Sequence, residues 1–528
     1  MPRTVYLATF GCQMNDLDSE LVRASLLEAG YLFVDRAREA DVVLFNTCSV
    51  RQHAEDKVYS ALGQLKRRKK ARPGLIIGVL GCMAQKDGEL IFQRAPWVDL
   101  VLGPGQLGRL VDSLDALISG RQKRVLELAL PRKGMPQAEV ARSFAAFDPP
   151  RRPDVRPLRQ QAMVRIMRGC DKFCTFCVVP SVRGPEQSRP AREIEAEVRA
   201  LADQGCVEVT LLGQTVNSYL DTTEGRQIRL ADLLERIAAI SGIRRIKFIT
   251  NHPKHMTDDL LQAVRDLPSV CPYLHVPAQS GSDRVLQRMR RGYTAAEYRE
   301  MICRIRETVP DGAITSDFIV GFCGETEEDF EATMELVRWA RFKNSFIFKY
   351  SPRPGTKAVE LYEDDVPEEV KRDRNRRLLA LQNEISLEEN RKFVGRRVEV
   401  LVEGISKLER KQQTSSVGLG SARLQLPIVG SNASKDGNWE LGREGFRAWG
   451  VGSGCVQVNL GCSGQKSEEV STGPRPEGQL QLSGRTVCDR IVVFPGRPEW
   501  IGQFLEVEVE RVSAVTLFGH VVSPPGCR

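Results

Sequence analysis

The stretch Arg168-Gly-Cys170-Asp-Lys-Phe-Cys174-Thr-Phe-Cys177 follows an apolar run, 162–168, that has the composition of a buried strand. Three thiolates with this spacing can hold three corners of a cubane iron–sulfur cluster. A tetrahedral zinc ion would need a fourth ligand, and no further Cys or His lies close by in the sequence. The pattern therefore predicts a cluster with one open iron that can bind a substrate. The alternatives are a zinc site completed by a distant residue, and packed cysteines.

The strand before this motif is the first of a series in which strand and helix patterns alternate. Six such βα units predict a partial (β/α)6 barrel over 161–393, with its functional groups at the C-terminal ends of the strands. The expected strands are 162–168, 207–213, 245–250, 273–279, 314–322 and 345–351. The expected helices are 191–205, 230–241, 257–267, 295–309 and 326–342, with long helices from about 367 to 393.

The first part of the chain, residues 1–125, also alternates strands and helices. Its strand candidates are continuous apolar runs, which are typical of parallel strands covered on both faces. The pattern therefore predicts an open parallel α/β sheet. The expected strands are 5–11, 41–47, 75–81 and 98–103, and the expected helices are 17–30 and 54–70.

Three further cysteines, Cys12, Cys48 and Cys82, each fall just past one of these strands, about one βα unit apart. The C-terminal ends of parallel strands meet at one edge of a sheet, where α/β proteins bind ligands. We therefore expect the three thiols to converge there and to hold a second three-cysteine cluster. The alternative is that each is an ordinary buried cysteine.

A Pro- and Arg-rich linker, 126–160, separates the first two domains, and its FDPPRRPDVRPLRQ stretch is unsuited to a regular helix or strand. The last part, 394–523, contains short strand patterns separated by turns, which predict a small β-barrel. Residues 411–480 interrupt it with 13 glycines and 9 serines and no sustained period. We interpret them as a flexible insertion.

The composition is that of a globular protein, with 41% hydrophobic and 27% charged residues. The longest apolar stretch, Gly74 to Ala84, is far below the roughly 18 residues that span a bilayer. The chain opens without the pattern of a secretion signal, and its 14 cysteines fit metal or redox chemistry in the reducing cytoplasm better than disulfides. The net charge of +8 permits a polyanionic partner without requiring one.

Both cysteine triplets, in this order and followed by a β-barrel, resemble the radical S-adenosylmethionine (SAM) methylthiotransferases. The resemblance covers about 1–405 and 481–522. Within that family, the GCQMN and NTCSVRQHAEDK stretches most resemble the MiaB type, the tRNA-2-methylthio-N6-dimethylallyladenosine synthases. The other matching stretches are GCMAQ, RGCDKFCTFC, SVRGPEQSRP, LLGQTVNSY, LHVPAQSGS, DFIVGFCGETEEDF and YSPRPGTKA. The C-terminal barrel resembles the TRAM RNA-binding module.

The resemblance implies two [4Fe–4S] clusters. Cys170, Cys174 and Cys177 would hold the radical cluster, whose open iron takes SAM for reductive cleavage to a 5′-deoxyadenosyl radical. Cys12, Cys48 and Cys82 would hold an auxiliary cluster that carries or donates sulfur. The radical would remove hydrogen from C2 of an isopentenylated adenosine beside the anticodon of tRNA, and a second SAM would methylate the sulfur. An electron donor and a sulfur source are also implied.

Two other readings stay open at this point. The same chemistry could act on a ribosomal protein or on threonylcarbamoyl-adenosine in tRNA. The chain could instead be a non-catalytic iron–sulfur regulator that binds RNA, although a purely structural cluster normally has four ligands. We expect a monomer that does not associate with membranes.

Several weaker candidates have a structural alternative. Gln214, Gln279 and Asp317 lie at or near expected strand ends and could contact SAM or the base, or only order loops. The run Lys66–Lys70 could bind tRNA phosphates or interact with the dipole at the end of its own helix. Arg353 could hold substrate or stabilise a turn.

Overall fold

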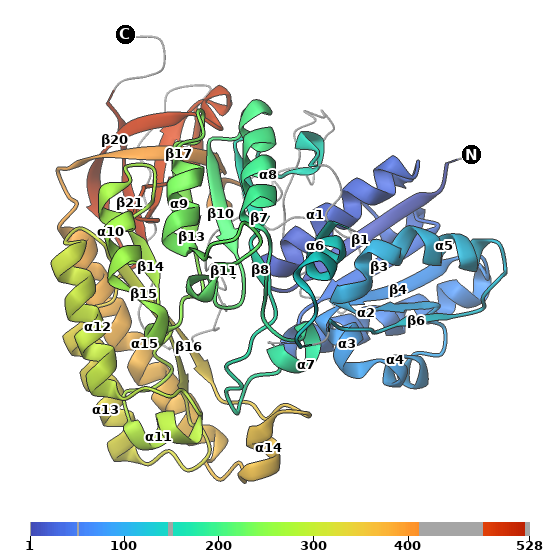
Figure 1. Ribbon diagram of the computed structural model, residues 1–528, viewed down its shortest axis with the longest axis horizontal. Coiled ribbons are helices and arrows are strands. Elements are labelled where there is room, and N and C mark those ends of the chain that lie inside the picture. Colours follow the sequence, from blue (N-terminus) through green and yellow to red (C-terminus); the bar gives the residue numbers. More distant parts are fainter. Residues whose placement is uncertain (1, 50–51, 132, 146–150, 411–478, 523–528) are drawn as a thin grey trace.

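The computed structural model describes residues 2–49, 52–131, 133–145, 151–410 and 479–522. These residues form an N-terminal α/β domain, a central partial barrel and a small closed β-barrel (Figure 1). The predicted fold class is therefore confirmed. The expected insertion, 411–480, lies outside the described residues except for its last two positions. No helix of the described residues is long and apolar enough to cross a membrane.

The N-terminal domain is a six-stranded parallel sheet in the order β2-β1-β3-β4-β5-β6. Its strands are buried on both faces, as their continuous apolar runs predict. In β3, for example, Val42 and Leu44 pack with α1 and α5, whereas Val43 and Phe45 pack with α2 and α4. The strands are β1 (Thr4–Phe10), β2 (Leu32–Phe33), β3 (Val42–Thr47), β4 (Ile76–Gly81), β5 (Leu100–Leu102) and β6 (Val125–Glu127), and the helices are α1 (Gln13–Glu28), α2 (Gln52–Ala71), α3 (Cys82–Asp87), α4 (Glu89–Arg94) and α5 (Leu110–Ile118).

The central domain contains the six expected parallel strands, in two sheets ordered β7-β10-β13 and β14-β15-β16. A parallel bridge between Ile246 of β13 and Val270, just before β14, and a bond from Asn251 N–H to the His275 carbonyl at 3.1 Å join the two sheets, so together they make an open, partial barrel. The strands are β7 (Gln161–Arg165), β10 (Glu208–Leu212), β13 (Arg245–Phe248), β14 (Tyr273–His275), β15 (Ala313–Val320) and β16 (Asn344–Lys349). Two short antiparallel pairs, β8 (Met167–Arg168) with β9 (Gln187–Ser188) and β11 (Leu220–Asp221) with β12 (Ile228–Arg229), were not predicted.

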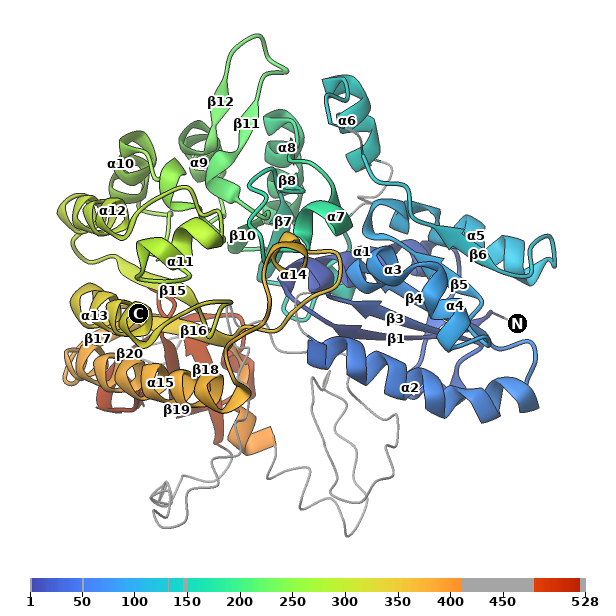
Figure 2. The same ribbon diagram turned by 90° about the horizontal axis from the view of Figure 1, so that it is seen from below.

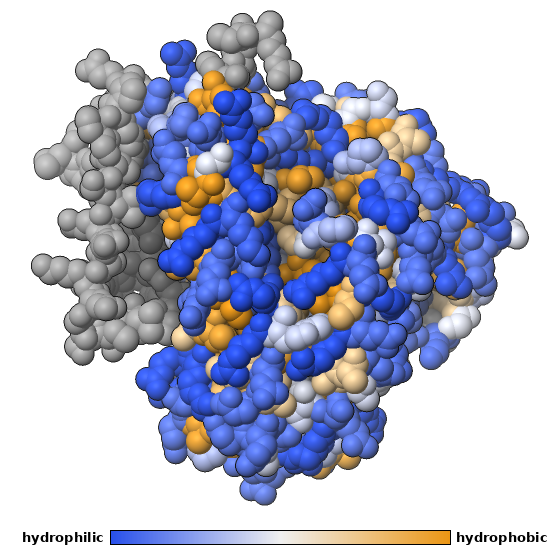
Figure 3. Space-filling model, turned by 90° about the vertical axis from the view of Figure 1, so that its left-hand side faces the viewer, coloured by the Kyte–Doolittle hydropathy of each residue, from blue (hydrophilic) through white to orange (hydrophobic). Residues whose placement is uncertain are grey.

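Helices cover the outside of this barrel and bury their apolar sides against the strands. The outer surface is accordingly mainly hydrophilic, with small separate hydrophobic patches (Figure 3). The helices are α7 (Val179–Arg183), α8 (Ala191–Asp203), α9 (Leu230–Ala238), α10 (Asp258–Asp266), α11 (Asp283–Arg288), α12 (Ala295–Thr308), α13 (Glu327–Ala340), α14 (Lys357–Leu361) and α15 (Glu368–Arg391).

The expected linker, 126–160, is more ordered than its composition suggests. Strand β6 extends the first sheet to Glu127, so the predicted boundary at residue 125 falls inside a strand. A helix, α6 (Gln137–Ala145), and a 3-10 turn, Pro153–Val155, follow within the same segment. The turn lies in the very stretch for which we expected no regular structure, because proline suits the first turn of a helix.

The N-terminal and central domains share one hydrophobic core. The apolar cluster around α1 continues into side chains on the barrel strands, including Met163 of β7, Leu212 of β10 and Tyr273 of β14. Adjacent strand residues such as Val164 and Leu211 belong instead to the cluster beneath the outer helices. Because strand side chains alternate between faces, the N-terminal domain packs against the inner face of the open barrel (Figures 1 and 2).

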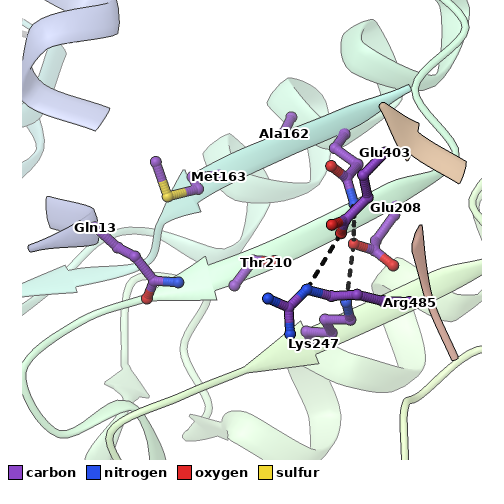
Figure 4. Close-up of a pocket in the computed structure, with 9 residues that line it drawn as sticks. Gln13, Ala162, Met163, Glu208, Thr210, Lys247, Glu403 and Arg485 are labelled. Carbon is purple, nitrogen blue, oxygen red and sulfur yellow. Dashed lines mark hydrogen bonds and ion pairs between the residues drawn. The ribbon is translucent and has the colours of Figure 1, made fainter. Parts of the chain in front are cut away.

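The C-terminal domain is a closed barrel in the order β17-β18-β19-β21-β20. It docks at the N-terminal ends of the central strands through charged side chains. Lys247 Nζ donates to Asp489 Oδ1 at 3.2 Å, and Gln161 Nε2 donates to Glu403 Oε1 at 3.2 Å. On either side of this junction, Lys247 also bonds Glu208 at 3.0 Å and Arg485 pairs with Glu403 at 3.4 Å (Figure 4). Its strands are β17 (Arg397–Ile405), β18 (Leu480–Arg485), β19 (Ile491–Gly496), β20 (Phe504–Val512) and β21 (Thr516–Val521).

Candidate metal centres and cofactor site

The ends of three N-terminal strands are aligned in the sheet. Phe10 of β1 pairs with Thr47 of β3, and Thr47 pairs with Gly81 of β4. Cys12 follows β1 by two residues, whereas Cys48 and Cys82 come directly after β3 and β4. The Cys48 N–H also donates to the Phe10 carbonyl at 2.9 Å. The structure therefore places the three predicted cysteines at one edge of the sheet, as the strand-end argument expects.

Two buried asparagines hold these strand ends together. Asn15 Nδ2 donates to Asn46 Oδ1 at 3.1 Å and to the Thr47 carbonyl at 3.2 Å, and Asn46 Nδ2 donates back to the Asn15 carbonyl at 2.9 Å. Gly81 has a φ of 89°, and a Cβ there would overlap Asn46 and the Thr47 carbonyl. The turn into Cys82 therefore requires glycine, both for its backbone conformation and for the close approach.

The three N-terminal thiols act on one another electrostatically. A hydrogen bond with Cys48 lowers the pKa of the exposed Cys12 to about 6, and the charge of Arg183 adds to this effect. Burial raises the pKa of Cys82, and the Arg183 guanidinium, which hydrogen bonds to this thiol, opposes that rise. Cys48 is buried beside them. The site thus combines three thiols with one buried cation.

The second group of cysteines lies on the loop that follows β7 and β8. Cys170 N–H donates to the Gly184 carbonyl at 3.1 Å, and Cys177 N–H donates to the Cys174 carbonyl at 3.0 Å. Gly169, with a φ of 73°, lets the loop approach this neighbour, because a Cβ there would overlap the carbonyls of Gly184 and Pro185. The backbone therefore fixes the loop independently of any bound group.

Side chains from outside this loop reach these cysteines. Arg291 Nη1 donates to Cys174 Sγ at 3.3 Å, and Thr215 Oγ1 lies 3.6 Å from Cys170 Sγ. Burial raises the pKa of Cys170, and burial together with Cys174 raises that of Cys177 to about 12. The raised pKa values favour the protonated thiols of Cys170 and Cys177. A bound metal cluster favours the thiolates and displaces those protons.

The donor sets fit iron–sulfur clusters. Each group consists of three thiols, and thiolates are the ligands of such clusters. This fit is one of donor type and position: as the described side chains stand, no three of His, Cys, Asp or Glu are gathered closely enough around one point to hold a single metal ion.

Helix α7 joins the two groups of cysteines. It begins at Val179, two residues after Cys177, and its Val182, together with Val178, packs against Cys82 of the first group. Helices α3 and α7 lie side by side in Figures 1 and 2. The two predicted metal centres are therefore neighbours across the interface between the first two domains.

The three predicted SAM contacts lie at the C-terminal side of the barrel strands. Gln214 follows β10, Gln279 follows β14, and Asp317 is on β15. The Gln279 N–H donates to the Asp317 carbonyl at 2.8 Å, so these two are neighbours. Among the described residues, the buried atoms Gln214 Oε1 and Asp317 Oδ1 have no hydrogen-bond partner. Buried polar atoms without partners are costly, which is consistent with a polar ligand there.

Asn251, which the sequence did not point to, also has a buried side-chain oxygen that could bind a polar ligand. Its Oδ1 is buried without a partner among the described residues, while its Nδ2 donates to the His275 carbonyl at 3.1 Å. It lies three residues beyond β13. The position just past a barrel strand, already used to choose Gln214, was the signal that could have identified it.

The basic run 66–70 is largely occupied within its own domain. Lys69 Nζ bonds the Asp99 carboxylate at 2.8 Å, Arg68 Nη2 donates to the Ala40 carbonyl at 2.8 Å, and Lys66 lies over the Trp97 ring. These contacts favour the structural alternative over phosphate binding for three of its five residues.

Arg353 forms a turn, and its charge interacts electrostatically with Glu55 and Cys48. Its carbonyl accepts bonds from Thr356 N at 3.2 Å and Thr356 Oγ1 at 2.7 Å. Burial lowers the pKa of its guanidinium, and the carboxylate of Glu55 and the thiol of Cys48 oppose this shift. Arg353 Nη1 is buried without a hydrogen-bond partner among the described residues. The turn is thus present, and the guanidinium keeps an unpartnered donor in addition.

Arg183 and Arg291, which contact one cysteine from each group, were also missed from the sequence. Each arginine lies far along the chain from the cysteine that it contacts, and a single arginine has no spacing pattern that would mark it in the sequence. The adjacent glycines in SVRGP and RRGY were the available signal, because Gly184 and Gly292 have φ values of 78° and 71°.

Three family models match the chain. The Radical SAM superfamily covers residues 164–337, the uncharacterized protein family UPF0004 covers 4–103, and the TRAM domain covers 473–522. These matches coincide with the barrel, the N-terminal sheet and the C-terminal barrel. The radical SAM match implies a [4Fe–4S] cluster and SAM as cofactors.

Full-length relatives carry one name. A tRNA-2-methylthio-N(6)-dimethylallyladenosine synthase of Rhodopirellula baltica is 50% identical over 521 residues, which are 99% of this chain and 96% of that protein. A protein of the same name from Acidovorax sp. is 40% identical over 528 residues, covering 99% and 98%. Among solved structures, the radical SAM methyltransferase TsrM of Kitasatospora setae has a TM-score of 0.47 at 14% identity, covering 68% of this chain and 74% of that one.

Proposed function

This chain belongs to the family of tRNA-2-methylthio-N(6)-dimethylallyladenosine synthases, and we propose that its two groups of three cysteines hold the two [4Fe–4S] clusters of that activity. It is a radical SAM enzyme that transfers a methylthio group to C2 of N6-isopentenyladenosine next to the anticodon of tRNA. The observation that best supports two clusters is the alignment of Phe10, Thr47 and Gly81, which brings Cys12, Cys48 and Cys82 to the sheet edge that faces α7.

The chain's own residues position the reactants and exclude water. Cys170, Cys174 and Cys177 would hold the cluster that would supply the electron for reductive cleavage of SAM to a 5′-deoxyadenosyl radical, and Cys12, Cys48 and Cys82 would hold a cluster that would supply sulfur. Gln214 and Asp317 offer unpartnered oxygens to the polar groups of SAM. Arg291 fixes the orientation of Cys174 through its 3.3 Å contact. The apolar contact of Val178 and Val182 with Cys82 excludes water from the packing between α7 and the first group.

The C-terminal barrel is placed to extend the tRNA contact beyond the reaction site. It docks at the starts of β7 and β13, whereas the cysteines follow strand ends. We propose that it binds tRNA away from the anticodon. An electron donor and a sulfur source complete the reaction, and we expect the protein to act as a monomer in the cytoplasm.

Iron content tests the two centres. Anaerobically reconstituted protein should hold about eight irons, as expected for two cubanes. A Cys12/Cys48/Cys82→Ala variant and a Cys170/Cys174/Cys177→Ala variant should each hold about half. The Cys303→Ala variant, which changes an exposed cysteine outside both groups, is the matched control and should hold the full amount. Full iron content in the first triple variant would refute the auxiliary centre.

Mass spectrometry of tRNA nucleosides tests the substrate. A strain that lacks the protein should accumulate isopentenyladenosine without its methylthio group, and the wild-type gene should restore that group. An unchanged methylthio-isopentenyladenosine level, with a ribosomal protein losing a modification instead, would assign the chemistry to the other target.

A further inference from the structure

Arg183 is a buried cation between the two groups of cysteines. It is the last residue of α7, and its guanidinium hydrogen bonds to the Cys82 thiol of the first group. The next residue, Gly184, accepts a hydrogen bond from the Cys170 N–H of the second group at 3.1 Å. The Arg183–Gly184 dipeptide therefore contacts both groups, with its charge directed at the first.

A fixed anion holds the guanidinium in place. Arg183 Nη2 donates to Asp18 Oδ2 at 2.9 Å, and Arg165 Nη1 approaches the other oxygen of Asp18 at 3.5 Å. The Asp18 side chain is fully buried, and the Arg183 side chain is only 5% exposed. Water therefore screens the charge of Arg183 little, so it acts strongly on the neighbouring thiols.

The packing of α7 keeps Arg183 beside the Cys82 thiol. Val178 and Val182 lie against Cys82, so α7 cannot move away without exposing an apolar contact. Arginine also stays charged under all ordinary conditions and can donate to a sulfur while it remains bound to a carboxylate. Arg183 therefore places a permanent positive charge beside one of the two candidate metal centres.

We propose that Arg183 is the counter-cation of the metal centre formed by Cys12, Cys48 and Cys82, and that it raises the reduction potential of this centre. The proposal rests on the proposed function, because it requires a cluster there. Net charge and hydrogen bonds to sulfur are among the factors that set such potentials. A nearby cation stabilises the more negative, reduced form, and its removal therefore shifts the potential downward.

The test measures this centre alone. A full-length Cys170/Cys174/Cys177→Ala background retains only the first group, and its midpoint potential is followed by an EPR-monitored redox titration. Adding Arg183→Gln should lower the equilibrium constant for one-electron reduction of this centre at least tenfold, which is a downward shift of its midpoint potential by about 59 mV. Arg183→Lys should retain most of the wild-type potential, which a role limited to packing does not predict.

Two further variants keep the test decisive. Arg165→Gln removes the other partner of Asp18 and should shift the potential less than Arg183→Gln. Asp18→Asn removes the anion that opposes Arg183 and should raise the potential. An unchanged potential in Arg183→Gln overturns the proposal; if that variant does not fold, an Asp18→Asn potential that is unchanged or lower overturns it. A background protein without iron would instead refute the auxiliary centre itself.

Discussion

Arg183 Nη2 lies 2.9 Å from Asp18 Oδ2, and this ion pair ties α7, which follows Cys177, to α1, which follows Cys12. Each helix begins next to a cysteine of a different group. The pair therefore fixes the orientation of the two groups relative to each other across a domain interface. Buried ion pairs of this kind contribute specificity of arrangement more reliably than stability.

Removing the anion of this pair should destabilise the protein. Asp18→Asn leaves two buried guanidinium groups without their shared carboxylate, which should cost about 3 kcal/mol of unfolding free energy. Urea unfolding measures the change. Asp154→Asn breaks the exposed pair with Arg152 and should cost under about 1 kcal/mol. Equal losses in the two variants would show that burial of Asp18 has no energetic consequence.

Gly169 should be required for the loop that carries the second group of cysteines. Gly169→Ala places a methyl group against the carbonyls of Gly184 and Pro185 at a positive φ, so the loop must shift. Reconstituted protein should lose about half of its iron. Gly225→Ala has a φ of 75° but open space around the new methyl, and it should keep the full iron content. Normal iron in Gly169→Ala would contradict the packing argument.

Gln214 and Asp317 should contribute to SAM binding without holding iron. Gln214→Ala and Asp317→Asn should each raise the Kd of SAM, by about tenfold for the charged group, because a hydrogen bond to a charged partner is worth about 1.5–3 kcal/mol. Equilibrium dialysis on reconstituted protein measures this Kd. The control Gln106→Ala changes a half-buried glutamine of the N-terminal domain, whose Nε2 donates to the Ala129 carbonyl at 2.8 Å. A Kd equal to wild type in both variants would leave these side chains only a loop-ordering role.

Glu325 should make stability depend on pH. Burial raises the pKa of this carboxyl to about 7, although it accepts bonds from Gly321 N at 2.6 Å and from Arg374 at 2.9 Å. The folded protein thus holds a proton that the unfolded chain releases near its ordinary pKa of 4.5. The stability that Glu325 contributes is present below pH 4.5 and is lost as the pH rises to about 7.

The Glu325→Gln variant isolates this effect. The unfolding free energy of wild type minus that of the variant should fall by up to about 3 kcal/mol between pH 4.5 and 7. Glu499→Gln, an exposed change of the same kind, should keep the wild-type slope. A wild-type-minus-variant difference that rises over this range would reverse the assigned sign and contradict the burial of the carboxyl as its cause.

The C-terminal barrel should close without residues 411–478. Ile405 of β17 and Leu482 of β18 are paired partners, so the ends to be joined already lie side by side. Replacement by a short Gly/Ser turn should leave iron content and SAM cleavage intact and tRNA binding equal or slightly stronger, because loop closure costs little. Filter binding measures the affinity for tRNA. Loss of tRNA binding would identify the segment as a recognition element.

The sequence by itself determined the local chemistry and the order of the domains. The spacing within 170–177 and the apolar runs before Cys12, Cys48 and Cys82 predicted the motif and the strand ends, because both depend on neighbours along the chain. Register then follows, since parallel strands of similar length align their ends. The proline-rich linker was the local exception: its composition concealed α6 and a 3-10 turn.

Only the tertiary structure decided which side chains complete the sites. Arg183 meets Asp18 across 165 positions of the sequence, and Arg291 meets Cys174 across 117. No periodicity encodes such pairs, because they arise when helices and strands pack into one core. The same holds for part of the basic run 66–70: Asp99 binds Lys69 and the Ala40 carbonyl binds Arg68, and the sequence predicted neither partner. Folding buries Arg183 and Arg291 beside partners far away in the chain, and that burial gives each of them its role.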